Sequence, residues 1–571
     1  MEKKWTLQAK VDQKEIELLS KQLNTLSPSL CNLLINRGIK SYDDAKDFFR
    51  PSLEKLHDPF LMKDMEKAVK RLQTAIAKQE NILIYGDYDV DGTTSVTLVY
   101  SFLSDTYNNI SYYIPNRYSE GYGISYQGID FAHENDITLI IALDCGIKAV
   151  EKIDYANKKG IDFIICDHHL PGDVVPNAHA VLDPKQRDCL YPYKELSGCG
   201  VGFKLMQAYS IKENIPIEKL LERIDILAVS ICADIVPITG ENRVLTYFGI
   251  QKLNQNPQAG FKAMLEIAQN KKKELTVTDV VFTLAPRINA AGRIESGNKA
   301  VEVMLSDNPI LANEGGQYID LQNTDRKELD KSITKEALAK IEADESLKNR
   351  TTTVLYQEDW HKGVIGIVAS RCIENYYRPT IILTKSKEMA AGSARSVKGF
   401  SVYNALEQCS DLLEQFGGHK YAAGMTMKIE NIPAFQQKFE EVVSQSIDPD
   451  LLIPEIEIDE ELDLSEINWK FYKILKQFAP FGPMNMKPNF LSKRVKDNGS
   501  GRIVGSDHLK LDMVDFENPG TPIPAIAFGL GNHFDLIKSG QAFDIVYHIE
   551  ENEWNGRVNL QLSIQDIRVS N

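Results

Sequence analysis

The stretch Tyr85-Gly-Asp-Tyr-Asp-Val-Asp-Gly92 directly follows the apolar run Ile82-Leu-Ile84. An apolar run that is closed by a glycine-containing turn predicts a buried strand. Three carboxylates, those of Asp87, Asp89 and Asp91, alternate at its tip and would repel one another unless a cation lies between them. Clusters of oxygen ligands are typical of Mg²⁺ or Mn²⁺ sites. The alternative for this stretch alone is an acidic surface turn.

The length and composition of the chain indicate a modular protein without a membrane span. At roughly 150 residues per domain, 571 residues predict three or four domains. The apolar share of 43% and the charged share of 25% are ordinary for a soluble globular protein. The longest apolar runs are far shorter than the ~18 residues of a membrane span. We therefore expect no membrane partner.

Cysteine usage and the first residues point to the cytoplasm. The eight cysteines show neither a CxxC pattern nor zinc-ligand spacing, and the start Met-Glu-Lys-Lys-Trp carries no apolar secretion signal. Reduced intracellular thiols explain this pattern better than a disulfide framework. The net charge of −15 argues only weakly against a nucleic-acid partner, because a basic groove can coexist with acidic outer surfaces.

Strand-like and helix-like stretches alternate from about residue 76 to residue 185. The apolar run before the acidic stretch is followed by similar runs at 110–114, 139–143, 163–166 and 180–182, with helix-like stretches between most of them. Alternation of this kind predicts a mostly parallel sheet with helices on both of its faces.

Polar side chains with ligand chemistry follow three of these runs. Asp144 ends one run, the triplet Asp167-His168-His169 ends the next, and Asp183 ends the last. A further carboxylate, Asp234, interrupts the apolar stretch 231–236, where a charge is costly unless it is paired or metal-bound. Because the carboxyl ends of parallel strands lie along one edge of a sheet, we expect Asp144, His168 and His169, together with Asp234, to converge with Asp89 and Asp91 of the first acidic stretch.

Each of these residues also has a structural interpretation. Asp144 could cap the helix that follows it, the two histidines could be satisfied core residues, and Asp234 could cap a helix or pair with Arg243. Taken together on successive strand ends, the residues favour a metal site. The glycine-rich turn at 198–202, before a helix, could cradle a phosphate, although we expect tight packing there instead.

Four motifs, in this order, carry a family resemblance. They are Asp87-Tyr-Asp-Val-Asp-Gly92, Asp144-Cys-Gly146, Asp167-His-His169 and Ala233-Asp-Ile-Val-Pro-Ile-Thr-Gly-Glu-Asn-Arg243. The chain resembles the DHH phosphoesterase superfamily in these motifs, and from end to end it resembles the bacterial single-stranded-DNA-specific exonucleases of that superfamily. The resemblance implies an α/β protein with a parallel-sheet DHH catalytic domain, a long connecting helix, a second α/β domain called DHHA1 and a C-terminal all-β OB-fold.

The resemblance, together with the sequence patterns, also predicts the domain boundaries. We expect an N-terminal helical segment at 1–75, the DHH catalytic domain at 76–305, the connecting helix at 306–350, the DHHA1 domain at 351–447 and the OB-fold at 448–571. In the last domain, period-two alternation predicts strands, with a hairpin at Trp554-Asn-Gly556. Lys493 and Arg494 would belong to a basic surface of this domain that binds single-stranded nucleic acid.

The resemblance implies a hydrolase that uses two divalent metal ions, Mn²⁺ or Mg²⁺, to remove 5′-mononucleotides from the 5′ end of single-stranded DNA in repair and recombination. By motif position, the metal ligands would be Asp89, Asp91, Asp144, His168 and Asp234. The catalytic residues would be Asp87, His169 and Asp144, the last of which would bridge the two ions. Many family members carry His where this chain has Tyr85, and a phenol is a poorer ligand for these ions than imidazole.

Two arginines of the middle region are candidates for contact with the DNA backbone. Arg287 and Arg293 lie six residues apart in the stretch 284–293. Guanidinium groups suit bidentate contact with phosphate, and ordinary surface ion pairs are the alternative.

A further set of residues would recognise the 5′-terminal phosphate and so determine the polarity of degradation. The resemblance implies that Arg117 from the first domain joins Ser393 and Arg395 of the DHHA1 domain around this phosphate. His419 would line the same cleft. Phe416 stands where the family usually has glycine.

Two other functions compete with the exonuclease. The first is a DHH-family oligoribonuclease or phosphoesterase for short substrates, against which the strand-binding OB-fold argues. The second is a non-catalytic single-strand-binding scaffold, against which the complete set of Asp and His argues. The exonuclease role implies single-stranded DNA with a 5′ end as partner, a helicase and a single-strand-binding protein as further partners, and the modular chain suggests a monomer.

Overall fold

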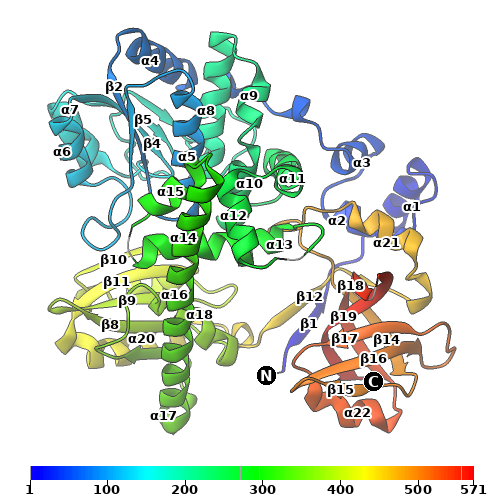
Figure 1. Cartoon of the computed structure of the whole chain (residues 1–571). Helices are drawn as coiled ribbons and strands as arrows, with labels where there is room; N and C mark the ends of the chain where they lie inside the picture. Colours follow the sequence, from blue (N-terminus) through cyan, green and yellow to red (C-terminus); the bar gives the residue numbers. More distant parts are fainter. Residues whose placement is uncertain (1, 271, 295, 555, 571) are drawn as a thin grey trace.

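The computed structural model, which describes residues 2–270, 272–294, 296–554 and 556–570, divides into three domains (Figure 1). A parallel α/β domain lies at the top of the view, a second α/β domain at the lower left and a β-rich domain at the lower right. A long helix, α16 (Pro309–Ala343), runs from the first α/β domain along the second. This architecture matches the predicted fold class.

Five parallel strands form the sheet of the first domain, in the order β3-β2-β4-β5-β6. The strands are β2 (Asn81–Gly86), β3 (Ile110–Tyr113), β4 (Ile137–Leu143), β5 (Asp162–Cys166) and β6 (Ala180–Leu182). Side chains of β2 alternate between two cores, with Ile82 and Ile84 on one face and Leu83 and Tyr85 on the other. Because both faces of the sheet are buried, the sequences of its strands are almost continuously apolar.

Helices cover both faces of this sheet. The face of Ile82 packs against α5 (Val90–Ser104) and α8 (Gly198–Glu213), and the opposite face packs against α6 (Tyr126–Glu134) and α7 (Val150–Lys158). The other helices of the domain are α4 (Met65–Ala77), α9 (Ile217–Leu221), α10 (Ile224–Ala233), α11 (Gly240–Gln255), α12 (Ala259–Ile267), α13 (Val277–Asp279), the π-helical turn η3 (Val280–Leu284), α14 (Ala285–Ile294) and α15 (Asn298–Leu305).

The connecting helix α16 begins with a side-chain cap and a proline. Asn308 accepts a hydrogen bond from the backbone N–H of Ile310, and Pro309 occupies the first turn, where its missing N–H is not needed. Its 35 residues span about 50 Å at 1.5 Å per residue. The C-terminal half packs through Ile333 and Ala337 against the second α/β domain, and α17 (Glu345–Lys348) follows.

The second α/β domain is built on a five-stranded mixed sheet with the order β10-β11-β9-β8-β7. Its strands are β7 (Thr353–Tyr356), β8 (Thr380–Ser386), β9 (Met389–Arg395), β10 (Gln415–His419) and β11 (Ala422–Lys428), of which only β7 and β8 pair in parallel. Its helices are α18 (Ile365–Asn375), α19 (Val402–Glu407) and α20 (Ile432–Ser446).

The β-rich domain has the strand pairing of an OB-fold. The strands β14, β16, β17, β18 and β19 form the barrel, in which β17 and β19 pair in parallel and β14 pairs with both β16 and β18. The elements are β13 (Glu460–Glu461), α21 (Trp469–Lys476), β14 (Phe490–Asp497), β15 (Arg502–Val504), β16 (His508–Asp515), β17 (Ile523–Ala527), α22 (Phe534–Ser539), β18 (Phe543–Trp554) and β19 (Arg557–Val569). The predicted hairpin turn includes residue 555, which lies outside the described residues.

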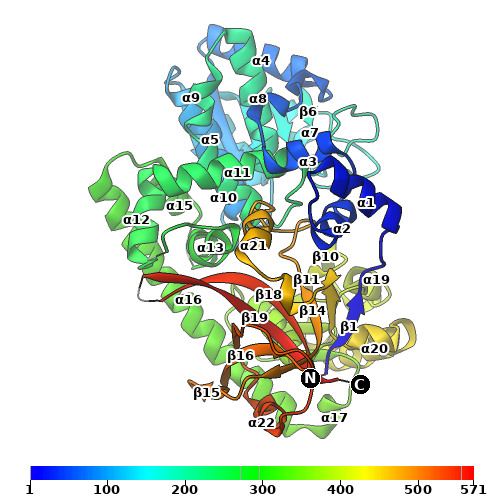
Figure 2. The same cartoon turned by 90° about the vertical axis from the view of Figure 1, so that its right-hand side faces the viewer.

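The N-terminal segment completes the core of this last domain. Its helices α1 (Gln13–Gln22), α2 (Pro28–Asn36) and α3 (Tyr42–Phe49) contribute side chains such as Leu30 to the same apolar cluster as Phe490. The segment also contains a strand, β1 (Lys4–Leu7), which pairs in parallel with β12 (Glu455–Ile458). Figure 2 shows β1 running down beside the barrel from α1.

Among the described residues, no helix combines the length and the apolar character that crossing a membrane requires.

Candidate active site

Four of the five predicted metal ligands, all except Asp89, converge at the carboxyl edge of the first sheet. The imidazole Nε2 of His168, which follows β5, lies 3.2 Å from an oxygen of Asp144, which follows β4. The same nitrogen lies 3.5 Å from an oxygen of Asp234 at the C-terminal end of α10, and 3.8 Å from an oxygen of Asp91 in the first turn of α5. His169 also reaches this group, with Nδ1 at 4.0 Å from Asp144. His168 is therefore the centre of the cluster.

The chemistry of this cluster fits divalent cations. Both ring nitrogens of His168, one oxygen of Asp144 and one of Asp87 are buried and have no hydrogen-bond partner among the described residues. Burial, reinforced by repulsion between neighbouring carboxylates, raises the pKa of Asp87, Asp89, Asp144 and Asp234. Burial lowers the pKa of His168 to about 4, so that its ring is neutral and able to coordinate a metal at neutral pH. Two divalent cations would relieve this repulsion.

Asp91 is held by the stretch that the sequence marked as a glycine-rich turn. The carboxylate of Asp91 accepts hydrogen bonds from the backbone N–H of Gly198 at 2.6 Å and of Cys199 at 2.9 Å. The hydroxyl of Ser230 donates a third bond at 2.6 Å. The glycines are not a turn before a helix, as predicted, but the first turn of α8. A side chain at position 198 would lie 2.5 Å from Cβ of Asp144, so close packing explains the glycine.

Asp167 orients the two histidines. It accepts hydrogen bonds from the backbone N–H of His168 at 2.7 Å and of His169 at 3.1 Å, and its carboxylate lies 2.8 Å from Nδ1 of His169. Burial opposes ionisation of Asp167, but the hydrogen bond and charge of His169 hold its pKa well below the usual range. Although burial disfavours the imidazolium, the bond to Asp167 raises the pKa of His169. His169 is therefore able to carry a proton beside the metal ligands.

Asp87 and Asp89 accept backbone hydrogen bonds that fix the conformation of the acidic turn and of a neighbouring loop. The side chain of Asp89 caps α5 by accepting a hydrogen bond from the N–H of Gly92 at 3.0 Å. Asp87 accepts one from the N–H of Gly123 at 3.0 Å, which ties the loop 115–123 to the cluster. That loop also places the hydroxyl of Tyr122 at 3.4 Å from Nε2 of His169.

Tyr85 points away from the metal ligands. Its ring is fully buried on the opposite face of the sheet and stacks on Tyr113. The hydroxyl donates to the carbonyl of Gly123 at 3.0 Å and accepts from the N–H of Ser125 at 3.1 Å. In this chain Tyr85 is a core residue that anchors the loop at 123–125, and it does not replace a metal ligand.

A second group of predicted residues surrounds a cavity of about 380 Å³ between the two α/β domains. Arg117 and Arg293 come from the first domain, and Ser393 and Arg395 come from β9. The guanidinium of Arg117 lies 4.9 Å from the ring centre of Tyr88. Among the described residues that line the cavity, none is acidic, so no lining carboxylate offsets the positive charge of these guanidinium groups.

His419, which was predicted to line this cavity, is not among the described residues of its lining, but it contacts the predicted metal site. Its ring, at the end of β10, stacks on the ring of His169 with the two centres 6.3 Å apart. Phe416 of the same strand lines the cavity. Arg287, in contrast, is not brought to the cavity: it is 8% exposed and forms a 2.8 Å ion pair with Asp320 of α16.

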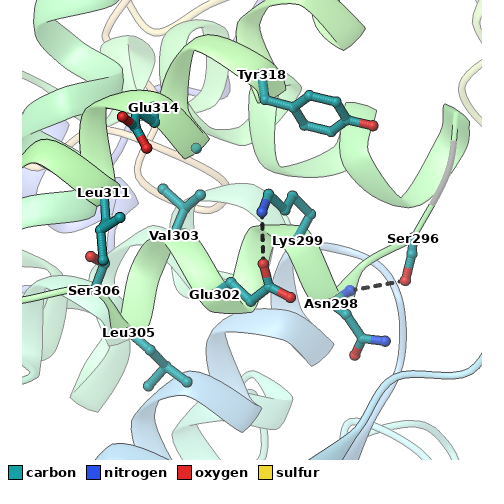
Figure 3. A pocket seen from close by; sticks show the side chains of 11 residues that line it. Ser296, Asn298, Lys299, Glu302, Val303, Leu305, Ser306, Leu311, Glu314 and Tyr318 are labelled. Carbon is teal, nitrogen blue, oxygen red and sulfur yellow. Dashed lines mark hydrogen bonds and ion pairs between the residues drawn. The ribbon is translucent and has the colours of Figure 1, made fainter.

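A larger cavity, of about 780 Å³, lies elsewhere, between α15 and the start of α16 (Figure 3). Lys299 and Glu302 form a 2.8 Å ion pair on one of its walls, and Leu311 lies on the facing helix. None of the predicted site residues lines it.

One predicted alternative and one predicted surface differ in the structure. Arg243 does not pair with Asp234, since its guanidinium donates to backbone carbonyls, including that of Phe478 at 2.9 Å. On the barrel, the charge of Lys493 is paired with Glu461 at 2.8 Å and that of Arg494 with Glu517 at 3.0 Å. These two residues therefore contribute less free positive charge than the sequence suggested.

The sequence did not predict Ser230 or Tyr122 as part of the site, nor the role of Asp167 within its motif. Ser230 and Asp167 act by holding Asp91 and His169, and Tyr122 reaches His169 from the loop. Asp167 lay within a motif already singled out, and its position directly after a buried strand was an available signal. Ser230 carried no signal, because a serine within a helix gives no indication of its distant partner.

Family models match three parts of the chain. The DHH family, N-terminal domain, matches residues 81–231; the DHHA1 domain matches 349–445; and the RecJ OB domain matches 458–566. These matches fall on the parallel sheet, on the second α/β domain and on the barrel, respectively.

Relatives match the chain over nearly its full length. The single-stranded-DNA-specific exonuclease RecJ of Escherichia coli is 34% identical over 95% of this chain and 96% of its own. The RecJ of Bacillus subtilis is 35% identical over 99% of this chain and 71% of its own. The crystal structure of RecJ in complex with Mn²⁺ from Thermus thermophilus superimposes with a TM-score of 0.85 at 26% identity, covering 100% of this chain and 80% of that one. The chain belongs to the RecJ family of single-stranded-DNA-specific exonucleases.

Proposed function

We propose that this chain is a metal-dependent exonuclease that degrades single-stranded DNA from its 5′ end and releases 5′-mononucleotides. The observation that carries the proposal is the junction of two sites. A cluster of carboxylates and histidines that fits divalent cations lies beside a cationic cavity. Tyr88 of the acidic turn lines that cavity, and His169 of the cluster stacks on His419 of β10, the strand that contributes Phe416 and Gly417 to the same lining. The relatives named as single-stranded-DNA-specific exonucleases support the substrate.

The metal ligands would be Asp89, Asp91, Asp144, His168 and Asp234, and Mn²⁺ or Mg²⁺ suits their oxygen and nitrogen donors. When bound, such ions lower the pKa of a water molecule and offset the negative charge of the phosphate under attack. The Mn²⁺ in the solved relative supports this choice.

Residues around the ligands have distinct roles in hydrolysis. Asp144, which is close to both His168 and His169, would be the carboxylate that two ions share. His169, whose pKa is raised through Asp167, would donate a hydrogen bond to the phosphate. Asp87 holds the loop 115–123 against the cluster. The chain would thus position the substrate through fixed side chains.

The cavity would determine the direction in which the strand is degraded. A terminal phosphate monoester carries about −1.5 to −2 charges at neutral pH, whereas an internal diester carries about one. Arg117, Ser393 and Arg395, with Arg293 beside them, would therefore select a 5′ end over the middle of a strand. The spacing between this cavity and the metal ligands would then determine that one nucleotide is released per cycle.

We further propose that the protein works in the cytoplasm as a monomer, with a helicase and a single-strand-binding protein as partners in repair and recombination. The eight cysteines are all free and buried, which suits a reducing compartment. The barrel at the C-terminal end of the chain would guide the strand.

The test uses single-stranded oligonucleotides labelled at either end, with and without a 5′ phosphate, in Mn²⁺ and then in EDTA. We expect metal-dependent release of mononucleotides from the 5′ end only, blocked by a duplex end and lost in Asp144→Ala. Tight binding without turnover would contradict the enzyme and favour a scaffold. Turnover confined to very short RNA would instead indicate an oligoribonuclease.

A further inference from the structure

The cationic cavity is larger than one phosphate group requires. Its volume of about 380 Å³ lies in the range of roughly 300–1,000 Å³ that whole small-molecule ligands occupy. Arg395 and Ser393 take up only one part of its wall. The remaining space therefore has to be explained by what else enters beside a terminal phosphate.

The floor of the additional space is a row of residues across three strands. The strand register sets Gly417 of β10 opposite Gly424 of β11, and Gly424 opposite Ser393 of β9. All three line the cavity. A Cβ atom built on Gly417 or on Gly424 would meet no atom within 4 Å, so the sheet leaves an open trough beside Ser393. Gln415 and Thr426, paired in the next row of the same face, add polar groups.

The charge around the cavity also exceeds what one phosphate offsets. Lys362 joins the three arginines in the lining, and no described residue forms a carboxylate ion pair with any of these four cations. Burial, and then repulsion from Arg117, lowers the pKa of Arg395 and that of Lys362. Burial, and then repulsion from Arg117, Arg326 and Arg395, lowers the pKa of Arg293 to about 10. Arg117 also lies close enough to Asp87 of the acidic cluster to interact with its charge. A monoester with about two negative charges leaves an excess of cations.

We propose that this cavity binds a polyphosphate group, either at the 5′ end of a strand or as a free polyphosphate, with the added phosphoryl groups in the glycine trough beside Ser393. The proposal rests on the proposed function, because it uses the same 5′-end site. It predicts that a strand with a 5′-triphosphate is a substrate. Water would add to the phosphorus of the first phosphodiester, the bond from phosphorus to the 3′ oxygen would break, and that oxygen would take up a proton. The products would be a nucleoside 5′-triphosphate and a strand with a new 5′-monophosphate.

The first experiment compares one oligonucleotide with a 5′-hydroxyl, a 5′-monophosphate or a 5′-triphosphate end, with Mn²⁺ in excess over all phosphates. We expect the triphosphate strand to be degraded within about threefold of the rate of the monophosphate strand, and mass spectrometry to identify a nucleoside triphosphate as its first product. A rate more than about tenfold below that of the monophosphate strand would contradict binding of such an end. No degradation of the monophosphate strand would contradict the proposed function instead.

The second experiment fills the trough. Gly424→Val places a β-branched side chain in a strand, where it is tolerated, and directs it into the open space. We expect the ratio of the triphosphate rate to the monophosphate rate to fall about tenfold, and Lys428→Val in the same strand, outside the lining, to leave that ratio unchanged. Turnover of the monophosphate strand shows that each variant folds. An unchanged ratio in Gly424→Val would contradict the placement in the trough.

The third experiment separates the two sources of the ligand. In EDTA, where no turnover occurs, inorganic tripolyphosphate and inorganic phosphate compete with a labelled 5′-monophosphate strand. Displacement by tripolyphosphate at about tenfold lower concentration, without degradation of the triphosphate strand, would identify a free polyphosphate as the ligand. Degradation of the triphosphate strand without such displacement would identify the DNA end. Failure of both would overturn the proposal.

Discussion

The hydroxyl of Ser230 donates a 2.6 Å hydrogen bond to Asp91, although 139 residues separate the two in the chain. Ser197 lies behind it, with its hydroxyl 2.7 Å from that of Ser230, and all three side chains are buried. Asp91 accepts two further bonds from the backbone of α8. Its orientation toward His168 therefore depends on residues outside the predicted set of metal ligands.

Removing that hydroxyl is expected to weaken metal binding more than it weakens the fold. Residues that orient a metal ligand typically change metal affinity by about 10–100-fold when mutated, so we expect Ser230→Ala to raise the Kd for Mn²⁺ by about tenfold. Calorimetric titration with Mn²⁺ measures this without turnover. Ser210→Ala is the matched control, because Ser210 is a buried serine of α8 whose hydroxyl bonds only within its own helix. Equal Mn²⁺ affinities in the two variants would argue against the positioning role.

Asp144→Asn should separate stability from activity. Asp144 is buried, its pKa is raised by burial and by Asp91 and Asp89, and its backbone φ of +59° suits asparagine. Without metal, neutralising it should raise the free energy of unfolding by about 1–2 kcal/mol, while turnover falls by roughly 10³-fold. Denaturant titration in EDTA and exonuclease assays in Mn²⁺ measure the two effects. A less stable metal-free variant would contradict the repulsion inferred for the cluster.

Arg395 and Arg287 should respond differently to truncation. Arg395 lines the cationic cavity, so Arg395→Ala is expected to raise the KM for a 5′-phosphorylated strand by about 10–100-fold, the value of a hydrogen bond to a charged group. The KM for a 5′-hydroxyl strand should change much less. Arg287→Ala removes the partner of the partly exposed Asp320, and should lower thermal stability without altering the preference for a 5′ phosphate. Loss of the preference for a 5′ phosphate in both variants would show that the cavity does not recognise the 5′ end.

Asp183 should make the stability of the metal-free protein depend on pH. Burial raises the pKa of its carboxyl to about 7, and one of its oxygens has no partner among the described residues. In the unfolded chain the same group ionises near pH 4, so between about pH 4 and 7 only the unfolded state loses this proton, and stability falls as the pH rises. The loss should be on the order of 2–4 kcal/mol and level off above pH 7.

The variant Asp183→Asn removes this titration. In EDTA, unfolding free energies at pH 5 and pH 8 should differ less in the variant than in the parent protein, and the variant should be the more stable of the two at pH 8. Parallel pH profiles would show that the folded state ionises Asp183 normally.

Tyr85→Phe tests the structural role of that hydroxyl. The change removes a buried acceptor for Ser125 and a donor to Gly123, and should cost about 1–3 kcal/mol of stability. Mn²⁺ affinity should stay within about twofold, because the ring lies on the other face of the sheet. A large loss of Mn²⁺ affinity would mean that the loop at 123–125, rather than Tyr85 itself, controls the ligands.

The fold could be predicted largely from local sequence patterns, because those patterns reflect which side chains the fold buries. The apolar runs at 139–143 and 163–166 became β4 and β5 because strands buried on both faces need apolar side chains throughout. The convergence of Asp144 and His168 followed from the shared carboxyl edge of those strands. Asp234 was harder to place: its apolar surroundings belong to the helix α10, which it ends.

The sequence did not reveal contacts between distant elements, because these depend on the direction in which each side chain points. Tyr85 lies beside the acidic stretch in sequence but faces the opposite core, because neighbouring strand residues alternate in direction. Arg287 and Arg293 looked equivalent, yet one is paired with Asp320 and the other lines the cavity. The positive charge of Lys493 and Arg494 was likewise offset by partners on other strands and loops.

The packing of the N-terminal helices on the barrel has a consequence for synthesis. Ala45 of α3 and Leu462 share one apolar cluster but are separated by 417 positions in the chain (462 − 45). At ~5–20 residues per second, a ribosome would need roughly 20–80 s to make that interval. During this time the nascent helices carry an uncovered apolar face while both α/β domains fold. These helices are translated before both α/β domains but would be among the last elements to reach their native contacts, and a premature stop upstream of the barrel would release a chain with that face exposed to aggregation.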